Sequence, residues 1–113
     1  MEPEMTCGDM IKYAFSKFLI EGFGTFVLTI LFIINNAYGL ILGYWILIIF
    51  CYSISHAHFN PAITFVYMFR SDSKKVKIPM AVLMMAVQCA GAFAAAAYMN
   101  FMFWSAKPMV PNN

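Results

Sequence analysis

The segment that decides the fold of this chain is Ser55-His56-Ala57-His58-Phe59-Asn60-Pro61-Ala62-Ile63-Thr64, which continues as an apolar run to Phe69. Asn60 is a favoured helix N-cap and Pro61 a favoured first helical residue, so the sequence predicts that a helix begins here. A helix over residues 61–69 would rise only about 13 Å, roughly half of the ~30 Å hydrocarbon layer of a membrane. The segment is therefore apolar enough for a membrane but too short to cross it.

Longer apolar stretches flank this short segment on both sides. Residues 13–34, 38–54 and 79–104 each approach the ~20 residues that a membrane-spanning helix needs. Of the 113 residues, 63% are hydrophobic and 11% are charged, less than half of the charged fraction of about 25% that is usual in globular domains. We therefore expect an all-α membrane protein with three transmembrane helices and one re-entrant half-helix, whose natural solvent is a lipid bilayer.

The composition excludes several other classes of protein. A chain this apolar is not disordered, and a net charge of +2 offers no basic stripe for nucleic acid. Three cysteines without paired or metal-type spacing do not make a disulfide scaffold, so we expect Cys51 and Cys89 to be small buried residues. No cofactor is expected.

Positive charges predict the orientation in the membrane. Lys12 and Lys17 flank the first span, and the basic loop over residues 70–77 precedes the third. By the positive-inside rule the N-terminus and this loop should be cytoplasmic, and the uncharged turn between the first two spans should face outward. The half-helix ends at the basic loop, so its beginning at Asn60 is expected near the membrane midplane. A helix lying on the membrane surface is the alternative, but residues 62–69 leave it almost no polar face.

The central segment resembles the Asn-Pro-Ala loop of the aquaporins and aquaglyceroporins, the major intrinsic proteins, whose pattern reads Ser-Gly-Ala-His-x-Asn-Pro-Ala-Val-Thr. Two further stretches resemble this family in the expected order. Glu21-Gly22-Phe23-Gly24-Thr25-Phe26 is similar to the Glu-Phe-x-Gly-Thr-Phe of its first helix, and Gln88-Cys89-Ala90-Gly91-Ala92 is similar to the Gln-x-x-Gly-Ala of its third. The resemblance extends over residues 18–98 and implies that residues 1–113 form one repeat, the first, of a fold built from two inverted repeats.

The resemblance implies that the central loop lines a pore. The predicted pore residues are His56, Ala57, His58, Asn60, Pro61 and Ala62. If the Asn60 side-chain oxygen caps the half-helix, its amide hydrogens stay free to bind a passing water or small alcohol. In the family the backbone carbonyls before the Asn-Pro-Ala line the cytoplasmic half of the pore. His56 replaces the family glycine, so its imidazole could crowd the pore or act as a titratable gate.

Glu21 is the only carboxylate inside a predicted span, and an ionisable group at that depth is a functional candidate by default. Thr25 and Thr29 follow it at intervals of one helical turn, so the three form one polar stripe. The resemblance implies that Glu21 and Gln88 brace the loop, Glu21 by accepting hydrogen bonds from the loop backbone; proton relay is the alternative. Ungapped counting places Leu40 at the family's filter position on the second helix, which suggests a wider constriction than an aromatic residue would make.

The leading interpretation is one repeat of a channel for passive movement of water or small neutral solutes such as glycerol, without enzymatic chemistry. The second repeat and the family's filter arginine do not occur in the sequence. We therefore expect a fragment that needs a second repeat, covalent or separate, and forms a homotetramer when complete. One alternative is a non-conducting half-repeat that regulates a full-length relative. Another is a membrane enzyme subunit with a metal on His56 and His58, which is disfavoured because no third ligand lies close in sequence.

Overall fold

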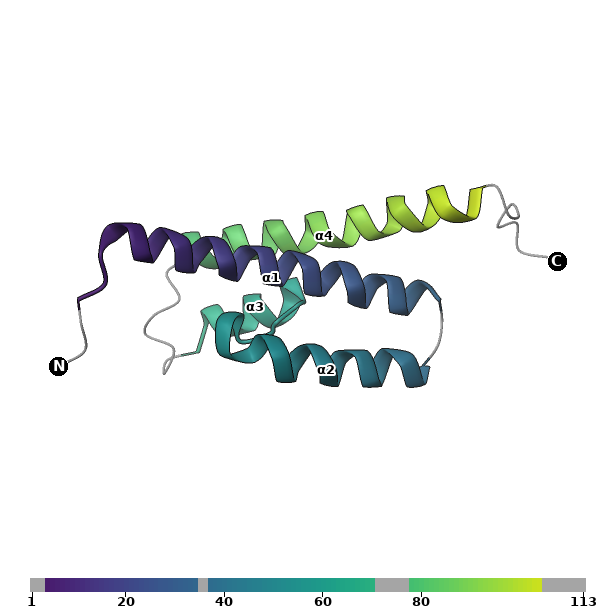
Figure 1. Cartoon of the computed structure of the whole chain (residues 1–113), viewed down its shortest axis with the longest axis horizontal. Coiled ribbons are helices and arrows are strands. Elements are labelled where there is room, and N and C mark those ends of the chain that lie inside the picture. Colours follow the sequence, from purple (N-terminus) through teal and green to yellow (C-terminus); the bar gives the residue numbers. More distant parts are fainter. Residues whose placement is uncertain (1–3, 35–36, 71–77, 105–113) are drawn as a thin grey trace.

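The computed structural model describes residues 4–34, 37–70 and 78–104, and these form an all-α fold (Figure 1). Three helices are long, namely α1 (Cys7–Ile33), α2 (Ala37–Ser55) and α4 (Ile78–Trp104), and α3 (Pro61–Met68) is short. By length and apolar composition, α1, α2 and α4 could each cross a membrane. The predicted fold class, an all-α membrane protein with three spans and a half-helix, is confirmed. The predicted turn at residues 35–36 and most of the basic loop, residues 71–77, lie outside the described residues.

Local sequence explains why α1 begins at Cys7, earlier than the predicted start at residue 13. Thr6 is the N-cap, and its side chain accepts a hydrogen bond from the backbone N of Asp9 at 3.4 Å. In return the backbone N of Thr6 donates to Oδ2 of Asp9 at 3.3 Å. This reciprocal capping box satisfies amide groups that a helix end otherwise leaves without partners. The first turns of α1 contain the charged residues Asp9 and Lys12, so a prediction based on apolar length alone misses them.

The helices pack around α1, which lies between α2 and α4, while α3 packs against α4 (Figure 1). The backbones of α1 and α4 come into contact where Gly22 faces Gly91. A Cβ atom on Gly91 would meet the carbonyl oxygen of Gly22, so only hydrogen atoms fit between the two backbones. On the other side of α1, Gly43 of α2 leaves room for the side chain of Leu31.

One narrow stripe of α4 is buried, and its members recur at helical spacing: Ala81, Met84, Gln88, Ala95 and Met99. The other faces carry large apolar side chains such as Phe93, as expected for a helix that lies in lipid. Cys89 lies outside the buried stripe and is exposed, and Cys51 is half-buried, so the expectation that both cysteines are buried is wrong. Successive residues of an α-helix are rotated by about 100°, so the side chain of Cys89 points away from the stripe that contains Gln88.

Candidate functional site

The loop over residues 56–60 connects α2 to α3 and reaches the middle of the bundle (Figure 1). Its backbone is left-handed at three positions, with φ values of 70° at His56, 52° at Ala57 and 50° at Phe59. For a residue other than glycine this conformation costs about 1–3 kcal/mol, so surrounding contacts must hold the loop. The φ value at His56 explains the glycine of the family pattern, because glycine adopts positive φ without steric cost.

Glu21 of α1 holds this loop through its buried side chain, which is 0% exposed. Oε1 accepts a hydrogen bond from the backbone N of His58 at 3.0 Å, and Oε2 accepts one from the backbone N of Phe59 at 2.7 Å. Oε2 also accepts a hydrogen bond from Nε2 of Gln88 at 2.9 Å. One carboxylate therefore joins the loop to both α1 and α4.

Thr64 of α3 extends this network. Its Oγ1 accepts a hydrogen bond from Nε2 of Gln88 at 3.0 Å and lies 3.1 Å from Nδ1 of His58. The His58 ring also packs on the ring of Tyr67, with centroids 4.5 Å apart. Its second nitrogen, Nε2, is buried and has no hydrogen-bond partner among the residues that the structure describes. The loop, α3 and α4 are thus tied together by buried polar side chains, as buried polar groups require.

The other amide groups at the start of the loop are also satisfied within the chain. The backbone N of His56 donates to the carbonyl oxygen of Tyr52 at 2.9 Å, and that of Ala57 donates to Oγ of Ser55 at 3.1 Å. The carbonyl oxygens of His56, Ala57 and His58 accept no hydrogen bond from the described part of the chain. The backbone N–H groups of residues 56–59 are therefore used, whereas the carbonyl oxygens of His56, Ala57 and His58 are available.

Asn60 is the N-cap of α3. Its Oδ1 accepts a hydrogen bond from the backbone N of Ala62 at 2.9 Å. Pro61 follows as the first helical residue, where a missing N–H group costs nothing. The Asn60 side chain is exposed on this chain, and its amide nitrogen donates to no group within residues 4–34, 37–70 and 78–104. The two amide hydrogens are therefore available to a ligand.

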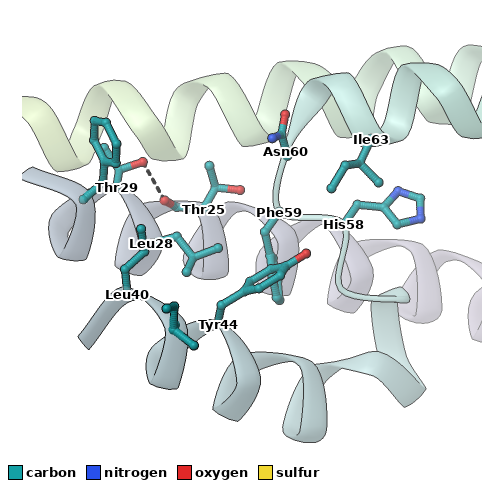
Figure 2. A pocket seen from close by; sticks show the side chains of 11 residues that line it. Thr25, Leu28, Thr29, Leu40, Tyr44, His58, Phe59, Asn60 and Ile63 are labelled. Atoms are coloured by element: carbon teal, nitrogen blue, oxygen red, sulfur yellow. Dashed lines mark hydrogen bonds between the residues drawn. The ribbon is translucent and has the colours of Figure 1, made fainter. Parts of the chain in front are cut away.

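A pocket of about 430 Å³ lies beside Asn60, between α1, α2, the loop and the start of α3 (Figure 2). It is lined by Thr25, Leu28, Thr29, Phe32, Leu40, Ile41, Tyr44, His58, Phe59, Asn60 and Ile63. The hydroxyl of Thr25 donates to the carbonyl oxygen of Glu21 at 2.7 Å, and that of Thr29 donates to the carbonyl oxygen of Thr25 at 2.8 Å. The hydrogen of each hydroxyl is therefore already used, so each oxygen offers only acceptor lone pairs to the pocket. The rest of the pocket wall is mostly apolar.

The sequence-predicted site residues fall into separate places. His58, Asn60 and Leu40 line the pocket, whereas His56, Ala57, Pro61 and Ala62 do not. Glu21 and Gln88 lie in the buried network that holds the loop. Within the described residues, no group of three or more His, Cys, Asp or Glu side chains could hold a metal ion.

Tyr44 and Phe59 line the pocket but were missed by sequence reasoning. Tyr44 follows Leu40 by one helical turn, so helical periodicity could have placed both on one face. Helical periodicity could not have placed Phe59, because its position depends on a contact with a distant residue. Its ring fills the space that Gly24 leaves open on α1. A Cβ atom on Gly24 would overlap that ring.

Three membrane-length helices and a short helix that begins in mid-bundle define an integral membrane protein with a re-entrant segment. Residues 27–112 match the family model described as Major intrinsic protein. The match includes more than half of the chain, so the chain belongs to the major intrinsic protein family, whose members are membrane channels for water and small solutes rather than enzymes. The resemblance inferred from the motifs is confirmed. No curated protein and no solved structure gave a significant match.

Proposed function

We propose that this chain forms one half of a channel through which water and small neutral solutes such as glycerol pass down their gradients. The hydrogen bonding of Asn60 is the observation that carries this proposal. Because Oδ1 caps α3, the side chain is held in place and its amide hydrogens stay free at the pocket wall. The oxygen of a water or an alcohol can accept those hydrogens as it passes, and no covalent step is needed.

The polarity around Asn60 supports the same function. The carbonyl oxygens of His56, Ala57 and His58 supply acceptors along the loop that leads to Asn60, and two threonine hydroxyls supply acceptors in the pocket. Such a path offers hydrogen bonds to a neutral solute at several steps. The N-terminus of α3 adds a partial positive charge of about half a unit, which disfavours cations beside Asn60.

Glu21 and Gln88 serve this channel as braces of the loop rather than as carriers of protons. The hydrogen bonds that Glu21 accepts come from two backbone amides and one side-chain amide, and none of these groups gives up its proton at ordinary pH. Their effect is to hold the backbone of His58 and the left-handed Phe59 next to Asn60. Asn60 is thereby held at a fixed position within the helix bundle.

A complete pore needs walls beyond those of this chain. The pocket is bounded by α1, α2, the loop and α3, and it is open on the remaining side. We propose that a second repeat, in the same polypeptide or in a separate chain, closes that side, and that the complete channel is a homotetramer. The basic residues Lys12 and Lys17 support a cytoplasmic N-terminus.

Osmotic shrinkage of proteoliposomes, followed by light scattering, tests conduction by the full polypeptide that carries this sequence. Asn60→Asp keeps the shape of the side chain and an oxygen that can cap α3, but it loses both amide hydrogens. We expect the wild type to shrink faster than protein-free liposomes and Asn60→Asp to lose most of that difference. Asn100→Asp, at an exposed asparagine of α4, should behave as wild type. Wild-type shrinkage at the protein-free rate would contradict conduction.

Co-purification distinguishes this function from that of a non-conducting half-repeat. A tagged protein that is isolated without a larger homologue and still conducts supports the channel. A protein that is isolated bound to a larger homologue, and is silent by itself, supports the regulatory alternative instead.

A further inference from the structure

We propose that the side chain of Tyr44 projects into the solute path and sets its width next to Asn60, so that Tyr44 rather than Leu40 is the main selectivity residue of α2. This inference rests on the proposed function. In this role Tyr44 decides which small solutes reach Asn60.

The positions of the two side chains in the pocket differ. Tyr44 and Leu40 lie on the same face of α2, one helical turn apart, and both line the pocket. Figure 2 shows Leu40 near the end of the pocket that holds Thr29, whereas the ring of Tyr44 extends toward the loop and Phe59. The longer side chain therefore lies at the end where Asn60 offers its amide. The Tyr44 ring therefore occupies the part of the pocket beside the loop that carries Asn60.

The hydroxyl of Tyr44 needs a partner that the described part of the chain does not provide. Tyr38 and Tyr52 lie near the two ends of α2 and are exposed, where a phenol can reach the aqueous interface. Tyr44 lies in the interior of the same helix and is only half-exposed, and its hydroxyl makes no hydrogen bond with the described residues. A phenol at that depth in lipid would go without a partner, which is unfavourable. Water or a solute hydroxyl in the pocket can supply the missing hydrogen bond.

The phenol also complements the other polar groups of the pocket. Thr25 and Thr29 present acceptors, because their protons are donated to α1, and Asn60 presents donors. The phenol hydroxyl of Tyr44 can both donate and accept a hydrogen bond, and it lies in the same pocket as apolar wall residues such as Leu28. The pocket therefore suits small uncharged solutes that carry a hydroxyl group, and the Tyr44 ring limits how wide they can be.

Cysteine labelling tests the position of Tyr44 without requiring conduction. In full-length protein with Cys7, Cys51 and Cys89 changed to serine, Tyr44→Cys is compared with Ile46→Cys, which lies on the opposite face of α2 and is exposed on this chain. Both are reconstituted in liposomes and treated with a small hydrophilic methanethiosulfonate, and labelling is read by mass spectrometry. We expect Tyr44→Cys to react many-fold faster. Equal rates for the two variants would overturn the proposal.

Solute selectivity tests the second part of the proposal. The ratio of glycerol to water permeability is measured for wild type, Tyr44→Ala, Tyr44→Phe and Leu40→Ala. We expect the ratio to rise several-fold in Tyr44→Ala, to change little in Tyr44→Phe, which keeps the ring, and to change less in Leu40→Ala than in Tyr44→Ala. A larger change in Leu40→Ala would overturn the assignment of Tyr44.

The two measurements separate failure of this inference from failure of the proposed function. A wild type that conducts, together with an unchanged ratio in Tyr44→Ala, overturns the role of Tyr44 alone. A wild type that is silent overturns the proposed function and with it any selectivity role. The labelling rates still decide whether Tyr44 faces a water-filled path.

Discussion

The two faces of α1 differ in what fills them. Toward α4, Gly22 and Gly91 bring the backbones into contact, and Glu21 and Gln88 form a buried network that holds the loop. Toward α2, two threonine hydroxyls face an open pocket of about 430 Å³ beside Asn60. The closed face therefore positions the loop, and the open face leaves room for a solute. Three substitutions test whether these contacts position the loop.

Loss of the Glu21 carboxylate should have the largest effect. Glu21→Ala leaves the amides of His58 and Phe59 and one hydrogen of Gln88 without their acceptor. Each buried unsatisfied group costs about 1–3 kcal/mol, so we expect the variant to lose several kcal/mol of stability. Thermal unfolding in detergent, followed by near-ultraviolet circular dichroism, measures the loss.

Glu4→Gln is the control for this substitution, because Glu4 is exposed on the chain. If Glu21→Ala does not accumulate, Glu21→Gln keeps one acceptor oxygen and should show faster hydrogen exchange at the His58 and Phe59 amides. An unfolding temperature equal to that of the control, or unchanged exchange, would mean that Glu21 does not hold the loop.

A methyl group at the α1–α4 contact should have a smaller effect. Gly91→Ala places a Cβ atom against the carbonyl oxygen of Gly22, so the two helices must separate. Overpacking of this kind costs about 1–3 kcal/mol. The same unfolding measurement is made on Gly8→Ala, because a Cβ atom at Gly8 meets nothing within 4 Å. Equal stability of the two variants would show that the closed face tolerates expansion.

Relief of strain in the loop should have the smallest effect, in the opposite direction. His56→Gly removes the Cβ atom from a residue with φ of 70°. The gain is limited to about 1 kcal/mol, because glycine also adds conformational freedom to the unfolded chain. His56→Ala keeps a Cβ atom and loses the ring contact with Tyr52, whose centroid lies 5.7 Å away, so it should not gain stability. A gain of equal size in both variants would exclude backbone strain as the cause.

The start of α3 could be predicted from the sequence because its cap is local. Asn60 and Pro61 act on amide groups within a few residues, so their effect does not depend on the rest of the fold. The start of α1 follows in the same way from Thr6 and Asp9, whereas apolar length alone places it six residues too late. Local capping is thus a better guide to helix ends than hydropathy.

The faces of the long helices could not be predicted in this way. Cys89 was expected to be buried, but α4 is rotated so that Gln88 meets Glu21, a partner 67 positions away in the sequence. Leu40 was selected by counting along the chain, which does not show that Tyr44 shares its pocket. In a helix that is apolar all round, hydropathy carries little information about rotation.

By itself, the sequence determined the three membrane-length helices, the half-helix and the family, because these depend on apolar length, a local cap and short motifs. The resemblance already implied that Glu21 and Gln88 brace the loop, but which amide groups they satisfy and which side chains face the pocket follow from the packing of the helices. The reason is physical. The carboxylate of Glu21 satisfies amide groups that are 37 and 38 positions away, and such a match exists only after the helices have packed.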